Sequence, residues 1–136
     1  MTMKQIDKII LHCSATPEGR NVTVSDIDRW HRQRGFASIG YHYVIYLDGS
    51  VHPGRPETQQ GAHCKGQNAR SIGVCYIGGC DKEMKPADTR TPEQRKALTE
   101  LVSELRKRYH GATVHGHNEC AAMACPSFNV AKEFGV

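Results

Sequence analysis

A chain of 136 residues has the usual length of one compact domain, and we expect a single domain over residues 1–136. With 38% hydrophobic and 24% charged residues, the composition is that of an ordinary globular protein and argues against a disordered chain. The net charge of +4 is spread along the chain, and nothing approaches the length of a membrane span. We therefore expect neither nucleic-acid binding nor membrane insertion.

The amino-terminal segment MTMKQIDKIILHC contains an apolar run too short for the core of a signal peptide. We therefore expect synthesis in the cytoplasm without an export signal. In that reducing compartment the six cysteines are expected to be free thiols or metal ligands rather than disulfides.

The first elements in chain order are a strand and a helix. Residues 6–12, IDKIILH, predict a short buried strand that ends at a histidine. The following TVSDIDRWHRQRG predicts a helix capped by Thr23, with Asp26 at its third position and Gly35 at its end. Ile27 and Trp30 are expected on its inward face.

A hairpin and a long loop are predicted next. The stretch YHYVIYLDGSVHPGR has two runs of strand formers around Asp48 and Gly49, which predicts a tight primed turn. Residues 54–70 predict a loop. The segment SIGVCYIGG, residues 71–79, predicts a buried strand because apolar residues dominate both of its faces.

The last third predicts a long helix, a short strand and a final short helix. TPEQRKALTELVSELRKRY has Thr91 as its cap, Pro92 at the first helical position and Gln94 closing a capping box. Residues 112–115 predict a strand, and Ser127 is expected to cap a helix that reaches residue 133. The inward stripe of the long helix is Leu98, Leu101, Val102, Leu105 and Tyr109. Strands interleaved with helices predict an α/β fold with a mixed central sheet flanked by helices.

Histidines and cysteines gather where the chain leaves predicted strands. His12 ends the first strand, and HGHNECAAMACPSF, residues 115–128, follows the last one. No two cysteines are three positions apart, so a structural zinc finger is disfavoured, whereas a catalytic zinc site needs only three such donors. The spacing alone does not choose between His115 and His117, or between Cys120 and Cys125.

Four segments carry a family resemblance: LHCSAT (11–16), GYHYVIYLDGSVHPGR (40–55), GAHCKGQNARSIGVCYIGG (61–79) and HNECAAMACPSFNV (117–130). Together they resemble the zinc-dependent N-acetylmuramoyl-L-alanine amidases, the type that includes bacteriophage amidase lysozymes and the peptidoglycan-recognition proteins. The resemblance covers nearly the whole chain in order. It implies Zn²⁺ as cofactor, with His12, His117 and Cys125 as its ligands.

The resemblance also implies roles around the metal. Tyr41 matches a tyrosine that donates to the oxyanion or orients the nucleophile, while His42 beside it would face the other side of a regular strand. His63, Asn68 and Arg55 resemble residues of the substrate groove.

One position departs from the family, because Met123 stands where many bacteriophage members have a lysine that stabilises the tetrahedral intermediate. A thioether offers neither charge nor a strong donor. Three outcomes follow: zinc and Tyr41 suffice, Lys65 or Arg55 supplies the cation, or the domain binds peptidoglycan without cutting it. The retained ligand set favours an enzyme.

The implied reaction is hydrolysis of the amide between N-acetylmuramic acid and L-alanine in peptidoglycan, as in an endolysin that reaches the wall after the membrane is breached. Recycling of wall fragments in the cytoplasm is the alternative setting. Non-catalytic binding of muropeptide is the rival function, and a protein partner such as an RNA polymerase is a further expectation drawn from the family.

Overall fold

The computed structural model describes residues 5–119 and 124–134. Its strands are β1 (Lys8–Cys13), β2 (Thr16–Pro17), β3 (Tyr43–Ile45), β4 (Val51–Pro53), β5 (Ser71–Tyr76), β6 (Gly79–Cys80) and β7 (Thr113–Gly116). Its α-helices are α1 (Val24–Gln33), α2 (Pro92–Arg108) and α3 (Val130–Phe134), and two 3₁₀ turns, η1 (Asn68–Arg70) and η2 (His117–Glu119), complete it.

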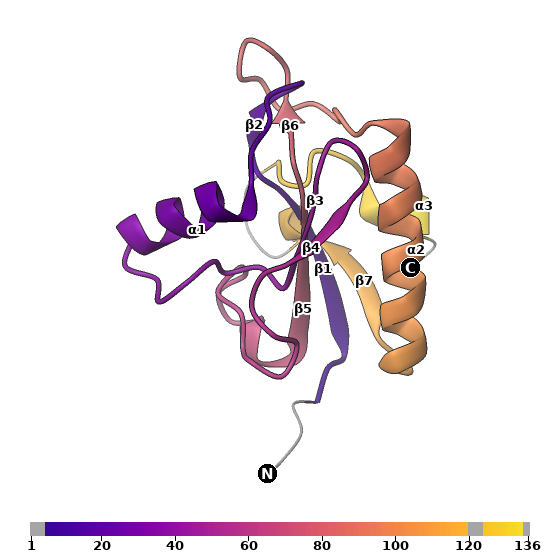
Figure 1. Cartoon of the computed structure of the whole chain (residues 1–136). Helices are drawn as coiled ribbons and strands as arrows, with labels where there is room; N and C mark the ends of the chain where they lie inside the picture. The colour runs from indigo at the N-terminus through magenta and orange to yellow at the C-terminus, as the bar shows by residue number, and fades with distance from the viewer. Residues whose placement is uncertain (1–4, 120–123, 135–136) are drawn as a thin grey trace.

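Five strands form the central sheet in the order β4-β3-β5-β1-β7 (Figure 1). β1 lies between β5 and β7 and runs parallel to both, and β3 runs parallel to β5. Only β4 is antiparallel to its neighbour, because it returns from β3 through a hairpin. The predicted mixed sheet is therefore confirmed.

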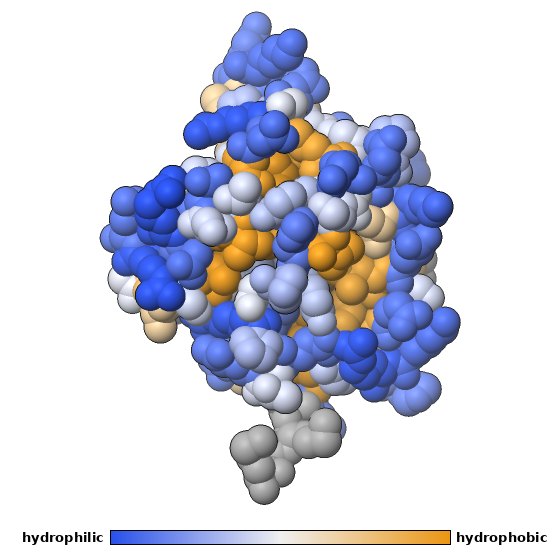
Figure 2. Space-filling model, in the orientation of Figure 1, coloured by the Kyte–Doolittle hydropathy of each residue, from blue (hydrophilic) through white to orange (hydrophobic). Residues whose placement is uncertain are grey.

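Helices cover both faces of the sheet, with α1 on one side and α2 and α3 on the other (Figure 1). The side chains of β1 and β5 alternate between two cores: Leu11 and Val74 pack against Leu98 of α2, whereas Cys75 packs on the other face against Ile27 of α1. The outward faces of α1 and α2 are hydrophilic (Figure 2). None of the described helices is long and apolar enough to cross a membrane.

Both predicted capping boxes are confirmed. The Thr23 side chain accepts from the amide of Asp26 and the Thr91 side chain from that of Gln94, and each third residue binds back to the cap. The amide group of Gln94 also donates to the carbonyl of Ile77 at 2.9 Å, which ties the start of α2 to the sheet.

Two local predictions were wrong. The hairpin has no two-residue primed turn: Tyr46 N–H donates to the Ser50 carbonyl and Gly49 N–H to that of Tyr46, and of the loop residues only Gly49 has a positive φ, of 86°. This is a three-residue loop that ends in a left-handed glycine. The cap of α3 is Asn129, whose side-chain oxygen accepts from the amide of Lys132, and not Ser127.

Candidate metal centre

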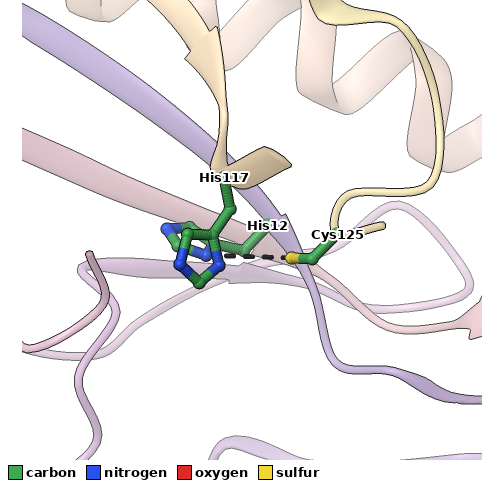
Figure 3. Close-up of side chains that lie close together, drawn as sticks. All are labelled: His12, His117 and Cys125. Atoms are coloured by element: carbon green, nitrogen blue, oxygen red, sulfur yellow. Dashed lines mark hydrogen bonds between the residues drawn. The ribbon is translucent and has the colours of Figure 1, made fainter. Parts of the chain in front are cut away.

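Three side chains from distant parts of the sequence meet at one edge of the sheet (Figure 3). His12 lies near the end of β1, and His117 follows β7 directly. Because these two strands are adjacent and parallel, with Leu11 paired to Gly116, the next residue of each chain segment lies beside the other, and the ring centroids of His12 and His117 are 4.5 Å apart. Cys125 reaches the same point from the loop before α3.

The spacing of these three donors suits a zinc ion. One ligand atom of each residue lies within 4.8 Å of the other two, and Sγ of Cys125 is 3.9 Å from Nδ1 of His12. Tetrahedral zinc, with bonds of about 2.05 Å to nitrogen and about 2.3 Å to sulfur, holds these two atoms about 3.6 Å apart. Two imidazoles and one thiolate leave a fourth position for water, as in catalytic zinc sites.

The two histidines are in the protonation state that a metal needs. Burial lowers the pKa of His12 well below its usual value, and the nearby His63, His117 and His31 rings lower it further. Burial also lowers the pKa of His117. Both rings are therefore neutral at neutral pH and keep a lone pair for a metal ion.

Hydrogen bonds hold Cys125 beside the end of β1. The backbone N–H of Cys13 donates to Sγ of Cys125 at 3.1 Å, and the Tyr76 hydroxyl donates to the carbonyl of Pro126 at 2.7 Å. The contact with the Cys13 thiol and burial together raise the pKa of Cys125. Both thiols are free, and a metal bound by Cys125 would displace its proton.

A buried arginine anchors the rest of this loop. The guanidinium of Arg90 lies 3.5 Å from the centroid of the Phe128 ring and bonds both carboxylate oxygens of Glu133 at 2.6 Å. It also binds Asp88 at 2.9 Å, and its side chain is 1% exposed. The segment that carries Cys125 is therefore tied to the long loop before α2 and to α3.

His117 and Cys125 line a groove of about 660 Å³ together with Tyr41, and the buried His12 lies directly behind them. The Tyr41 ring centroid is 5.0 Å from that of His12. Burial raises the pKa of Tyr41 well above its usual value, and the Cys75 and Cys125 thiols raise it further. The phenol therefore keeps its proton at neutral pH and can act as a hydrogen-bond donor.

His42 takes no place in the groove. Its ring is buried, with Nδ1 accepting from the amide of Gly73 at 3.0 Å and Nε2 within 2.8 Å of the Gln59 carbonyl. Tyr41 and His42 thus have different surroundings, although both precede β3 and neither lies in it. The ring of His42 ties the loop before β5 to the sheet.

The three residues expected to bind substrate are placed differently from one another. His63 lines the groove but is buried, and its Nδ1 lies 2.8 Å from Nε2 of His12. Asn68 also lines the groove, and its side-chain oxygen accepts from the amides of His63 and Cys64 at 2.9 Å each. It therefore stabilises the loop that carries His63.

Arg55 has a different position from the one we expected. Its guanidinium donates to the carbonyls of Ile39, Gln60 and Ser38, and it is not among the residues that line the groove. Its charge holds two loops together through their backbone oxygens. Of the two cations considered as substitutes for the family lysine, Lys65 alone lines the groove.

Met123 and Cys120 lie outside the described residues. His115, the other candidate of the pair left open by spacing, turns to Thr113 and Glu119, whose oxygens lie 2.7 and 3.1 Å from its ring nitrogens. It is not part of the cluster of donors, which contains His117 instead.

Residues around the end of α1 also line the groove, and none of them was predicted from the sequence to belong to the site. The chief one is His31, whose Nδ1 accepts from the amide of Gly40 at 2.9 Å, so a neutral ring carries its proton on Nε2. Its ring centroid lies 5.3 Å from that of Tyr41. His31 follows the inward-facing Ile27 by four positions, and that helical spacing was a usable indication. The others are Trp30, Arg34 and Phe36.

Comparison with known proteins gives this geometry a context. Residues 2–128 match the family described as N-acetylmuramoyl-L-alanine amidase. The endolysin of Escherichia phage T7 is 44% identical over 124 residues, which make up 91% of this chain and 82% of that protein.

Two solved structures extend the likeness to the fold. The N-acetylmuramoyl-L-alanine amidase LysC from Clostridium intestinale superimposes with a TM-score of 0.82 at 28% identity, covering all of this chain and 94% of that one. A mutant of Drosophila PGRP-LB in complex with tracheal cytotoxin superimposes with a TM-score of 0.79 at 25% identity, covering 97% of this chain and 81% of that one.

Proposed function

Because this chain belongs to the N-acetylmuramoyl-L-alanine amidase family, we propose that His12, His117 and Cys125 bind the zinc ion with which it hydrolyses peptidoglycan. The bond that is cut joins N-acetylmuramic acid to the L-alanine of the stem peptide. The observation that carries the proposal is the convergence of two neutral imidazoles and one thiol within 4.8 Å of one another, where His117 and Cys125 line an open groove. When bound, zinc supplies a Lewis acid that activates water and polarises the amide carbonyl.

The residues of the chain would then position the substrate and stabilise charge. We assign Tyr41 the hydrogen bond to the carbonyl oxygen as negative charge develops there, because Tyr41 lines the groove, its ring lies beside that of His12 and its hydroxyl is protonated. His31 would offer a second donor through Nε2, which is protonated because Nδ1 accepts from a backbone amide. Both donors come from side chains already fixed before substrate arrives, and such donors need little reorganisation.

The charge of the groove suits an anionic stem peptide. Arg34 and Lys65 both line it, and no aspartate or glutamate does so within the described part of the chain. Carboxylates of the stem peptide would therefore meet cations and no like charge. Since Met123 offers no charge, we assign Lys65 the electrostatic support that the family lysine gives elsewhere.

The setting that we propose is that of an endolysin, since a relative with 44% identity over most of the chain bears that name. Muropeptide is the substrate fragment consistent with a groove of about 660 Å³. The comparisons do not support the expected RNA polymerase partner, and it is not proposed.

Digestion of purified peptidoglycan, followed by mass analysis of the products, tests the proposal. Wild-type protein should release stem peptides that begin with L-alanine, lose this activity after chelation and regain it with zinc. Cys125→Ser should abolish release and zinc retention. Cys80→Ser is the matched control, since it removes a buried cysteine that does not line the groove. Release of stem peptide by metal-free protein, or by Cys125→Ser, would contradict the assignment.

A further inference from the structure

A chain of three hydrogen bonds leads away from His12 into the interior. Nε2 of His12 lies 2.8 Å from Nδ1 of His63, and Nε2 of His63 lies 3.2 Å from the Ser71 hydroxyl. That hydroxyl donates to the carbonyl of Gln67 at 2.8 Å. His12, His63 and Ser71 are all buried.

The direction of every bond in this chain follows from its last member. A backbone carbonyl can only accept, so the Ser71 proton points to Gln67 and the Ser71 oxygen accepts from Nε2–H of His63. A neutral His63 then has a lone pair on Nδ1, which accepts from Nε2–H of His12. Nδ1 of His12 is left unprotonated, and this is the nitrogen that lies 3.9 Å from Sγ of Cys125.

From this order of protons we propose that His63 is a positioning residue, which selects the tautomer of His12 whose Nδ1 lone pair faces the metal. The inference rests on the proposed zinc site, and it gives His63 a role other than the substrate contact expected from the sequence. A metal-binding histidine needs a partner on its second nitrogen to fix its tautomer and its orientation. Here the partner is a second imidazole, that of His63, which could either donate or accept. Its hydrogen bond to Ser71 makes it the acceptor of the bond from His12.

The backbone around His63 is adapted to this position of its ring. A Cβ atom on Gly73 would come within 2.7 Å of two atoms of the His63 ring, and one on Gly61 would also come within 2.7 Å of it. The Asn68 side chain binds the amide of His63 itself, as described above. The ring thus lies against β5 in a space that only glycine at position 73 leaves open.

The first test examines the tautomers directly in metal-free wild-type protein. Long-range ¹H–¹⁵N correlation spectra distinguish protonated from unprotonated ring nitrogens. We expect both His12 and His63 to carry their proton on Nε2. A His12 ring protonated on Nδ1 would overturn the proposal, whatever the metal turns out to be.

The second test measures zinc affinity by competition with a chromophoric chelator. His63→Phe keeps a ring but removes the acceptor, and we expect zinc binding to weaken by about 10- to 100-fold. His63→Asn restores an acceptor close to the position of Nδ1 and should bind zinc more tightly than His63→Phe. His52→Phe is the matched control, since His52 bonds Ser50 and stacks on Tyr46 outside the groove, and it should bind as wild type.

Ser71→Ala keeps the test decisive if His63→Phe does not fold. Without the hydroxyl, His63 is no longer held in one tautomer, so the spectra should show His12 in both forms and zinc should bind more weakly. Unchanged zinc affinity in folded His63→Phe, or a single unchanged tautomer of His12 in Ser71→Ala, would refute the positioning role. Wild-type protein that binds no zinc would instead refute the proposed function, while the spectra would still test the hydrogen-bond chain.

Discussion

Replacing the buried Arg90 with methionine should strongly destabilise the contacts that hold α3 and the loop before it in place. The substitution keeps most of the volume of the side chain but removes the charge that Asp88 and Glu133 share. It also removes the cation that lies 3.5 Å from the centre of the Phe128 ring. Since Arg90 is 1% exposed, the pairs it forms are little screened by water.

The size of the effect follows from what remains after the change. Removing one partner of a buried ion pair costs about 3–5 kcal/mol. The side chains of Asp88 and Glu133 are 25% and 34% exposed, so water can solvate them again and the loss should lie near the lower end, about 3 kcal/mol. With an unfolding entropy of about 2.1 cal/mol/K per residue, a loss of 3 kcal/mol lowers the Tm of this chain by roughly 10 °C.

Thermal unfolding followed by circular dichroism would measure this loss, with Arg95→Met as the control. Arg95 binds the same carboxylate of Asp88 at 3.1 Å, but its side chain is 51% exposed. Exposed pairs contribute about 0–1 kcal/mol, so the control should lose less than about 4 °C. Equal losses in the two variants would refute the view that burial makes the Arg90 contacts strong.

Three further changes have defined outcomes. Burial raises the pKa of Glu57, but hydrogen bonds from Arg108 and two tyrosines outweigh burial and hold the pKa below its usual 4.5. The charged carboxylate therefore stabilises the fold above pH 4.5, and this stabilisation is lost as the pH falls through the pKa of Glu57 in the folded protein. Glu57→Gln should therefore cost about 1–3 kcal/mol in urea unfolding at neutral pH, and less in acid. Tyr41→Phe should lower kcat by about 10²- to 10³-fold on muropeptide and leave the zinc content unchanged. Because we assign Lys65 the role of the family lysine, Met123→Lys should leave kcat nearly unchanged.

Each of these three predictions has a result that would count against it. A Glu57→Gln deficit that does not change between neutral and acidic pH would mean that the charge of Glu57 contributes nothing. Loss of zinc in Tyr41→Phe would indicate a role in forming the site instead of in the reaction. A large rise in kcat for Met123→Lys would mean that the absent donor limits the chemistry and that Lys65 does not fill the role.

Features encoded within a few consecutive residues were predicted from the sequence. The capping boxes at Thr23 and Thr91 each depend on two positions three apart, and the inward stripe of α2 depends on helical periodicity alone. The turn after β3 was mispredicted because Asp48 and Gly49 suit two hairpin loops, and the pairing of Tyr46 with Ser50 decides between them. This pairing is part of the strand register, which depends on both strands of the hairpin and not on the turn residues alone.

Features of the site that depend on strand register and on loop packing could not be predicted from local sequence patterns. The choice between His115 and His117 follows from the parallel pairing of β1 with β7, which brings the second of them next to His12. His63 lies in a segment without periodicity, and its bond to His12 joins residues 51 positions apart. Only the family resemblance indicated that this loop approaches the metal, and it did not indicate the bond.

X-ray absorption at the zinc edge is the most direct test of the metal centre. Purified wild-type protein should show one sulfur at about 2.3 Å and nitrogen or oxygen neighbours at about 2.0 Å. The sulfur contribution should disappear in Cys125→Ser, together with the release of stem peptide. A wild-type spectrum without sulfur, or a sulfur neighbour that survives in Cys125→Ser, would contradict the site formed by His12, His117 and Cys125.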